Sequence, residues 1–205
     1  MFVIVEGANG AGKTTLINNL SSRGCQTLSS PNGTPLAKML RPACRGTEPW
    51  QDIDKKVQFL LFSAARLDEY IRLVHNKPNI VVADRWWTST YVYQCCFQGI
   101  STDFLLHTIH PEEKIDLIIL LDAKNEVLVE RVKKEREANA THGICRWTQK
   151  DEDVFELARI YRDDLPDFVL SKFKIPVVKV DTTVLTENQV LEHALNLIDL
   201  YNLPK

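Results

Sequence analysis

The fold of this 205-residue chain is decided by one short stretch, Gly7-Ala8-Asn9-Gly10-Ala11-Gly12-Lys13-Thr14. An apolar run, Phe2 to Val5, precedes it, and a segment that begins at Thr15 and has the pattern of a helix follows. In this strand–turn–helix setting, G-x-x-x-x-G-K-[ST] predicts a loop whose backbone N–H groups surround phosphate oxygens. The dipole of the helix adds positive potential, and the lysine and threonine suit terminal phosphates and Mg²⁺. We therefore expect a nucleotide triphosphate site over Gly7 to Thr15.

Composition and charge limit the class of protein. The length, with 44% hydrophobic and 25% charged residues, is ordinary for one α/β domain, expected over residues 1–205. A formal net charge of −2 argues against a nucleic-acid polymer as the main partner. No apolar run approaches a membrane span, and the first strand begins at the N-terminus, so we expect neither a membrane segment nor a signal peptide. The five cysteines form no C-x-x-C pair, which is typical of reduced thiols in a cytoplasmic protein.

Apolar runs alternate with helical patterns along the chain. Buried parallel strands are expected at 79–83, 117–122 and 177–181, because these runs are unbroken. A shorter strand is expected at 25–30, a short helix at 36–40 and an irregular stretch at 41–49. The other helices are expected from the phosphate loop to about 22, and at 52–75, 88–97, 124–139, 152–170 (interrupted near Pro166) and 187–200. This order predicts an α/β fold, a doubly wound parallel sheet with helices on both faces.

The long helix at 52–75 shows two apolar faces. A stripe with helical spacing is expected to face the core: Val57, Leu60, Leu61, Ala64, Leu67, Asp68, Ile71 and Val74. Phe59, Phe62 and Arg66 fall on the opposite face, which must then pack against something. A dimer contact explains this face, and so does a ligand pocket, since Phe62 and Arg66 suit a planar base.

Charged residues gather where ligands of α/β sheets bind. Asp84 and Arg85 directly follow an apolar strand, so they are expected at its carboxyl edge, beside Trp86. The helix at 124–139 and the segment after it are rich in cations, including Arg136 and Arg146, although interleaved glutamates also fit a solvated face. With the phosphate loop, these residues favour phosphoryl transfer, in which charge neutralisation and positioning dominate.

The chain resembles the thymidylate kinase family over nearly its whole length. The similar segments are Val5-Glu6-Gly7 through Thr15, Gly33-Thr34-Pro35-Leu36, Leu60-Leu61-Phe62-Ser63-Ala64-Ala65-Arg66, Asp84-Arg85-Trp86, Ser89-Thr90 through Tyr93-Gln94, Leu121-Asp122 and Glu130-Arg131. The resemblance implies a three-layer P-loop kinase fold, with a five-stranded parallel sheet flanked by helices and a short mobile lid at about 133–147. It implies an ATP-dependent kinase that converts dTMP, with dUMP as a further acceptor, to the diphosphate, as a cytoplasmic homodimer that uses Mg²⁺.

The resemblance also implies roles for single residues. On the donor side, Lys13 and Thr14 would hold ATP phosphates and Mg²⁺, and Asp84 would orient metal-bound water. The lid arginines, Arg136 and Arg146, would cover the transferring phosphoryl group.

On the acceptor side, the resemblance implies that Arg85 clamps the phosphate. Phe62 would stack on the base, Arg66 would donate to its exocyclic carbonyl and Gln94 would meet the ring edge. Ser89 and Thr90 would lie on the helix that lines this pocket.

The acceptor side departs from the family pattern at two places. Asn9 stands where a carboxylate usually contacts the sugar, so it becomes the candidate sugar contact here. Ser29 and Ser30 stand where an arginine and an acid usually precede the proline of the second-strand loop. These departures leave the identity of the acceptor open.

Two other functions fit parts of the sequence. A deoxynucleoside kinase, or a kinase of broader deoxynucleotide specificity, would also use the phosphate loop, but its base would be Glu48, which lies well past the second strand. A GTP-dependent switch should carry Asn-Lys-x-Asp after a strand, whereas Asp-Ala-Lys-Asn follows Leu121.

Overall fold

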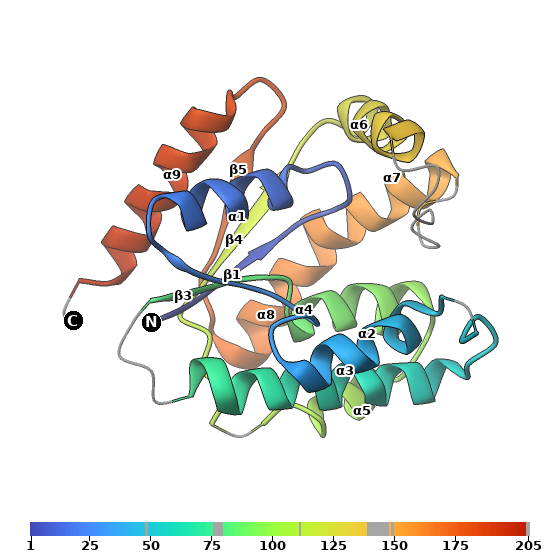
Figure 1. The fold of residues 1–205 in the computed structure, drawn as a ribbon. Helices are drawn as coiled ribbons and strands as arrows, with labels where there is room; N and C mark the ends of the chain where they lie inside the picture. Colours follow the sequence, from blue (N-terminus) through green and yellow to red (C-terminus); the bar gives the residue numbers. More distant parts are fainter. Residues whose placement is uncertain (48, 76–79, 111, 139–147, 149, 204–205) are drawn as a thin grey trace.

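A computed structural model describes residues 1–47, 49–75, 80–110, 112–138, 148 and 150–203 of the chain. Five parallel strands form one sheet in the order β2-β3-β1-β4-β5, with helices on both faces (Figure 1). The strands are β1 (Phe2–Glu6), β2 (Gln26–Ser29), β3 (Val81–Asp84), β4 (Leu117–Asp122) and β5 (Val177–Asp181). This arrangement confirms the predicted fold class.

The sheet brings the carboxyl ends of its three central strands together. Every residue of β1 is buried, as are the first five of β4, because helices cover both faces of these almost entirely apolar strands. Val5 of β1 pairs with Asp84 of β3 and with Ile119 of β4. The phosphate loop after β1 therefore lies beside the chain that leaves β3.

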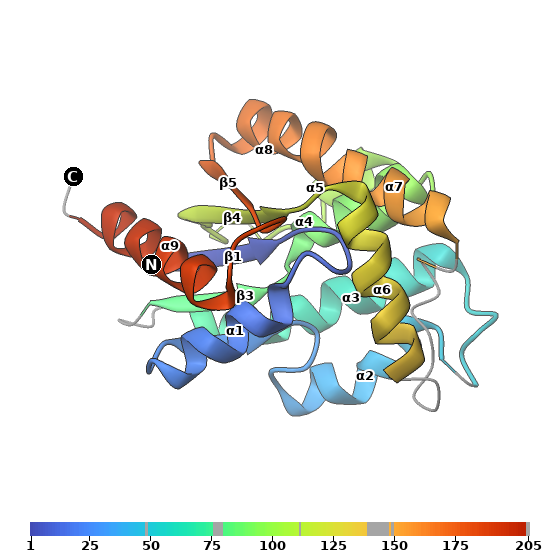
Figure 2. The ribbon, with the colours of Figure 1, turned by 90° about the horizontal axis from the view of Figure 1, so that it is seen from above.

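The helices form two layers around this sheet. They are α1 (Lys13–Ser22), α2 (Pro35–Arg45), α3 (Lys55–Glu69), α4 (Trp87–Thr90), α5 (Thr102–Leu106), α6 (Asn125–Ala138), α7 (Asp151–Arg159), α8 (Leu165–Phe173) and α9 (Glu187–Tyr201). Three π-helical segments join them, η1 (Tyr70–Val74), η2 (Tyr91–Phe97) and η3 (Ile160–Asp164). Figure 2 looks onto the face that α1 and α9 cover, and α3, α4 and α8 lie on the other side of the sheet. Within the described residues, no helix is both long and apolar enough to cross a membrane.

The expected orientation of the long helix is wrong. Its predicted core stripe faces outward, with Val57, Leu60, Leu67 and Ile71 between 37% and 55% exposed. The face that carries Phe59 packs inward instead, and the Phe59 ring is fully buried. Both faces are apolar, so periodicity alone could not decide which one meets the core.

Two prolines lie inside helical stretches. The stretch 41–45 is helical, which corrects the irregular segment expected there; α2 continues through Pro42 because Ala43 and Cys44 bury their side chains, and Gly46, with φ 60°, ends it. The interruption expected near Pro166 is confirmed in a different form. The helix runs on from α7 to α8, and its turn before the proline widens into η3, because proline has no N–H and crowds the preceding turn.

Candidate active site

The phosphate loop takes a conformation that only glycine accommodates. Gly7, Gly10 and Gly12 have φ of 144°, 82° and 96°. A Cβ on Gly7 would lie 2.2 Å from the carbonyl oxygen of Leu121, so β4 approaches the loop too closely for any side chain. The loop is thus fixed in shape by its contact with the neighbouring strand.

Lys13 is the buried cation of this loop. Its Nζ donates to the carbonyl oxygen of Ala8 at 2.8 Å, and its side chain is almost fully covered. Burial, with a smaller contribution from the Arg85 charge, lowers the pKa of Lys13 to about 7. Burial thus disfavours the charged form of this amine, and a bound phosphate would favour it.

An arginine of α6, Arg131, also contacts the phosphate loop, and the sequence predicted no role for it. Arg131 Nη1 of α6 donates to the carbonyl oxygen of Gly10 at 3.2 Å and to Thr182 Oγ1 at 3.1 Å. Thr182, which follows β5, in turn donates to the carbonyl oxygen of Ala11 at 3.2 Å. In the sequence, Arg131 was one cation among several on this helix, and the family-like pair Glu130-Arg131 gave it no role of its own.

Asp84 and Arg85 lie beside the loop, as the strand-end pattern predicted. Asp84 Oδ1 is buried and has no hydrogen-bond partner among the described residues. Arg85 has φ 68°, a backbone conformation that is unfavourable for a residue with a side chain. Such strain often marks a functional position.

The Arg85 guanidinium lies in a network of polar groups from four segments. Its Nη2 donates to Asn9 Oδ1 at 2.8 Å, and its Nη1 donates to Tyr161 Oη at 2.7 Å and to Ser89 Oγ at 3.1 Å. Glu6 Oε2 lies 3.8 Å from Nη1. The network joins the phosphate loop to α4 and η3.

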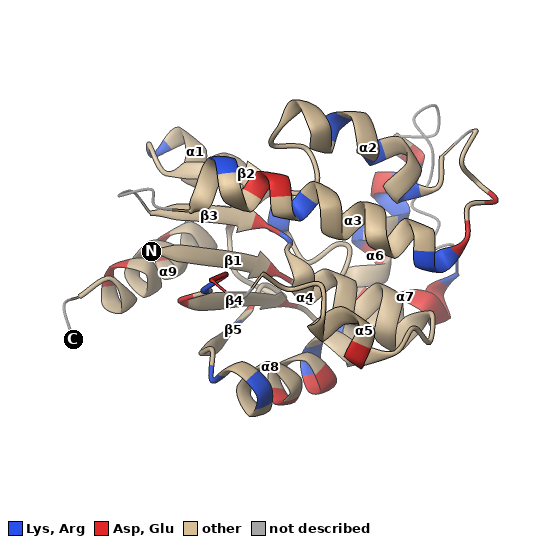
Figure 3. Ribbon diagram, turned by 90° about the horizontal axis from the view of Figure 1, so that it is seen from below, with Lys and Arg blue, Asp and Glu red and all other residues tan. Residues whose placement is uncertain are grey.

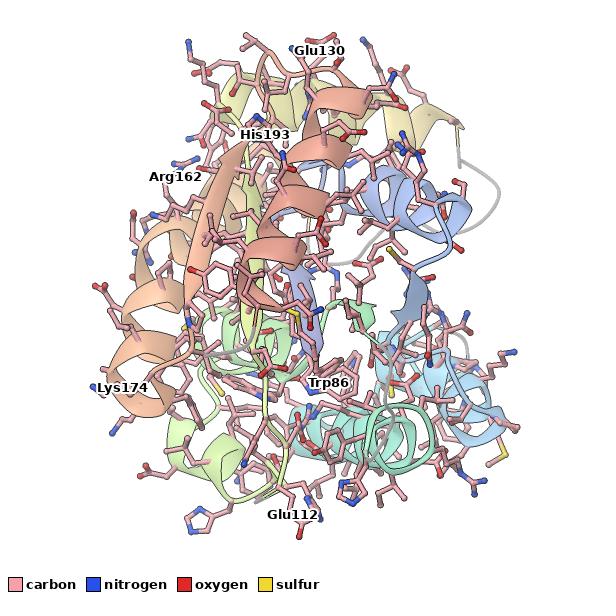
Figure 4. All side chains as sticks on the ribbon, turned by 90° about the vertical axis from the view of Figure 1, so that its left-hand side faces the viewer. Trp86, Glu112, Glu130, Arg162, Lys174 and His193 are labelled. Atoms are coloured by element: carbon pink, nitrogen blue, oxygen red, sulfur yellow. The ribbon has the colours of Figure 1, made fainter. Side chains whose placement is uncertain are left out.

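Glu6 is the buried anion below this network. Its carboxylate accepts from the backbone N–H of Trp86 at 3.2 Å, from Thr88 Oγ1 at 2.5 Å and from Ser89 Oγ at 2.8 and 3.0 Å. Figure 4 shows where Trp86 lies, next to the end of β3. In the sequence, Glu6 stands out only as part of the Val5-Glu6-Gly7 motif, although a carboxylate at the end of an otherwise apolar strand is a signal for a buried ion pair.

The inner face of α3 and the residues of α4 and η2 form a second wall. Arg66 is buried and donates to Thr90 Oγ1 and to Ser63 Oγ, both at 3.4 Å. Burial lowers the pKa of Arg66, and the carboxylates of Glu113 and Glu69 act against this shift. Gln94 is also buried, and Phe62 is half-buried. The structure thus puts a cation, an amide and an aromatic ring on neighbouring elements.

The second-strand loop is organised by the carboxylate of Glu69, for which no sequence pattern predicted a role. Glu69 of α3 accepts from Ser30 Oγ at 2.6 Å and from the backbone N–H groups of Asn32 and Gly33 at 2.8 and 2.6 Å. Burial raises the pKa of Glu69 despite these bonds. Ser30 therefore holds the loop, whereas Ser29 is exposed and pairs in register with Asp84.

Of the two expected lid arginines, one can be described. Arg136 at the end of α6 donates to the carbonyl oxygen of Thr148, and its Nε is buried without a partner among the described residues. The hydroxyl of Thr148 accepts from Asn9 Nδ2 at 3.3 Å, which connects this region to the phosphate loop. Arg146 and most of the expected lid, residues 139–147, lie outside the described residues. So does Glu48, the base considered for a deoxynucleoside kinase.

Comparisons with known proteins agree on one family. The family model for thymidylate kinase matches residues 5–174. The thymidylate kinase of Acinetobacter baylyi is 29% identical over 212 residues, covering 97% of this chain and 100% of that protein. That of Shouchella clausii is 29% identical over 170 residues, covering 75% and 74%.

Solved structures show the same fold. The thymidylate kinase of Ehrlichia chaffeensis superimposes with a TM-score of 0.68 at 18% identity, covering 97% of this chain and 98% of that one. The thymidylate kinase of Candida albicans gives a TM-score of 0.70 at 18% identity, covering 97% and 91%.

Proposed function

The chain belongs to the thymidylate kinase family, and from this membership we infer that it transfers the γ-phosphoryl group of ATP to dTMP, giving ADP and dTDP. The observation that supports the residue roles best is the meeting of the phosphate loop with Asp84 and Arg85 at one edge of the sheet. Donor and acceptor phosphates would meet there, with cations on both sides. The alternative kinase and switch functions have no comparable support. We propose one domain over residues 1–205, placed in the cytoplasm, with no membrane or nucleic-acid partner.

The donor phosphates would bind to the glycine loop. Its backbone N–H groups and the start of α1 favour anions, and Lys13 would leave the carbonyl of Ala8 to contact the phosphates. In this buried setting, an ammonium group stabilises the charge that develops on the moving phosphoryl group much better than water does.

The site has oxygen ligands that fit Mg²⁺. Asp84 Oδ1 is buried without a hydrogen-bond partner among the described residues, and Thr14 is exposed at the first turn of α1. Carboxylate and hydroxyl oxygens beside phosphates suit this ion, which keeps several of its waters. A bound Mg²⁺ would neutralise charge on the phosphates. We assign Thr14 and Asp84 to hold it.

We assign Arg85 to the acceptor phosphate. Its fixed guanidinium presents N–H groups at the sheet edge, beside the phosphate loop. The arginine would hold the acceptor oxygen close to the donor phosphate, and this orientation is itself a large part of catalysis. Arg136, together with Arg146, would cover the transferring group.

The second wall suits a pyrimidine with exocyclic oxygens. Phe62 would stack on the ring, Arg66 would donate to the carbonyl and Gln94 would pair with the ring edge. Cytosine would turn an amine toward the donors of Arg66 and leave buried polar groups unpaired. We therefore propose that dTMP is the best acceptor and that dUMP is also accepted. Asn9 would contact the sugar more weakly than a carboxylate, so 3′-modified analogues should be tolerated.

We further propose that two copies of the chain pair through α3. The residues at 57, 60, 64, 67 and 71 have the alternating spacing of three and four that packs one helix against another. Four of these side chains are large and apolar, and together they form an exposed apolar stripe of the kind that marks an interface. Figure 3 shows α3 beside α2 at the surface of the molecule. In a two-fold symmetric dimer the same patch of both copies meets, so the two apolar stripes would cover each other.

One coupled assay tests the proposed reaction. ADP release from ATP and Mg²⁺ is measured with each deoxynucleoside, with each deoxynucleoside monophosphate, and with neither. We expect release with dTMP above all others. Release with deoxynucleosides only, or at the same rate without an acceptor, would contradict the proposal.

A further inference from the structure

Only some of the N–H groups of Arg85 donate hydrogen bonds to the described residues of the protein. Both Nη1 protons have acceptors, Tyr161 Oη and Ser89 Oγ, and one Nη2 proton goes to Asn9 Oδ1. The described residues offer the Nε–H no acceptor. An anionic ligand can therefore take the Nε–H and the second Nη2–H, but only if the guanidinium stays in this orientation.

The shortest of these bonds ends on Tyr161, whose side chain is 2% exposed. Its hydroxyl also lies 2.9 Å from Ser89 Oγ, which donates to the Glu6 carboxylate at 2.8 Å. Ser89 has one proton and gives it to the carboxylate, so Tyr161 must donate to Ser89 while it accepts from Arg85. Burial raises the pKa of Tyr161, which keeps the hydroxyl protonated as this order requires.

The helix that carries Tyr161 is itself anchored to the sheet. The next residue, Arg162, donates from Nε and Nη2 to the Asp122 carboxylate at the end of β4, at 2.7 and 3.0 Å. Figure 4 labels Arg162 on this segment. Tyr161 and Arg162 both lie in η3, the π-helical turn before Pro166. A rigid attachment of this turn gives the tyrosine hydroxyl a fixed position.

We propose that Tyr161 is a positioning residue that fixes the Arg85 guanidinium for the acceptor phosphate. It works through Arg85 and does not itself touch the substrate. The inference rests on the proposed function, because it takes the phosphate of dTMP as the ligand of Arg85.

Calorimetric titration with two ligands tests this role. Thymidine and dTMP differ only in the phosphate, so the ratio of their affinities isolates the contact that Tyr161 supports. In Tyr161→Phe we expect dTMP to bind about tenfold more weakly or worse, the usual effect of losing a hydrogen bond to a charged group, and thymidine to bind as in the wild type. Tyr201→Phe is the matched control: Tyr201 is the last residue of α9, to which no part of the site belongs, and it packs half-buried against the core. It should leave both affinities unchanged.

The Arg85→Ala background separates positioning from general loosening of the structure. If Tyr161 acts through Arg85, Tyr161→Phe should cause no further loss of dTMP affinity once Arg85 is alanine. An equal loss in both backgrounds, a parallel loss for thymidine, or unchanged dTMP binding in Tyr161→Phe would overturn the inference. Wild-type protein that binds no dTMP would instead contradict the proposed function.

Discussion

Lys13 should take up a proton when a nucleotide binds. In the empty protein its pKa is about 7, against an ordinary value of 10.5, mainly because burial disfavours the charged form. Phosphate oxygens would bring further negative charge close to the amine and restore the ordinary pKa. Binding should then be accompanied by uptake of about half a proton near pH 7, and of about nine-tenths of a proton near pH 8.

The same shift predicts how stability depends on pH. Between pH 7 and 10.5 the unfolded chain holds a proton on Lys13 that the folded protein has lost. Stability of the empty protein should therefore rise with pH through this window, and below it Lys13 should cost up to about 5 kcal/mol. The neutral variant Lys13→Met should be more stable than the wild type at pH 6, as measured by urea unfolding.

Titration calorimetry in buffers of different ionisation enthalpy measures the proton uptake. ADP with Mg²⁺ is titrated into wild type and into Lys13→Arg, whose guanidinium keeps its proton throughout. The difference between the two proteins removes protons taken up by the nucleotide itself. If the heat of binding depended on the buffer equally in wild type and in Lys13→Arg, Lys13 would take up no proton, contrary to this prediction.

Three other predictions concern the acceptor site, the loop and the dimer. Arg85→Ala should raise the KM for dTMP and lower kcat together, whereas Ser29→Arg should lower that KM by adding a cation beside Asp84. Steady-state kinetics measures both effects, and unchanged KM values would mean that these residues are wrongly assigned. Gly7→Ala should lower the midpoint of thermal unfolding and abolish ATP binding, because its Cβ would lie 2.2 Å from the carbonyl oxygen of Leu121; a variant that binds ATP normally would contradict this. Leu60→Lys should convert a dimer into a monomer in sedimentation experiments, whereas Val184→Lys, at an 86% exposed site elsewhere, should not.

Local patterns predicted which residues meet at the carboxyl edge of the sheet. The glycine loop and the Asp84-Arg85 pair each follow a strand, and parallel strands bring such residues together, so their meeting followed from the topology. The contact of Tyr161 with Arg85 could not be foreseen, because it depends on a π-helical turn far along the chain. The same is true of Glu69, whose partners lie in a loop more than 30 residues away.

Long-range packing also explains the error on α3. Leu60 and Phe59 are adjacent apolar residues on different faces, and only the surrounding elements determine which face is covered. An apolar stripe that stays exposed on a helix has the same residue spacing as one that packs against the core. Sequence patterns of this kind therefore locate a packed helix without orienting it.

We expect this chain to move a phosphoryl group from ATP to dTMP at the edge of the sheet that contains Lys13 and Arg85. The most direct measurement is product identification by anion-exchange chromatography, after incubation of the purified protein with ATP, Mg²⁺ and equal amounts of dTMP, dUMP, dCMP, dAMP and dGMP. We expect dTDP to form first, in equal amount to ADP, and Lys13→Ala, although folded, to form less than about a tenth as much. ADP without any diphosphate product, or dGDP or dADP ahead of dTDP, would contradict it.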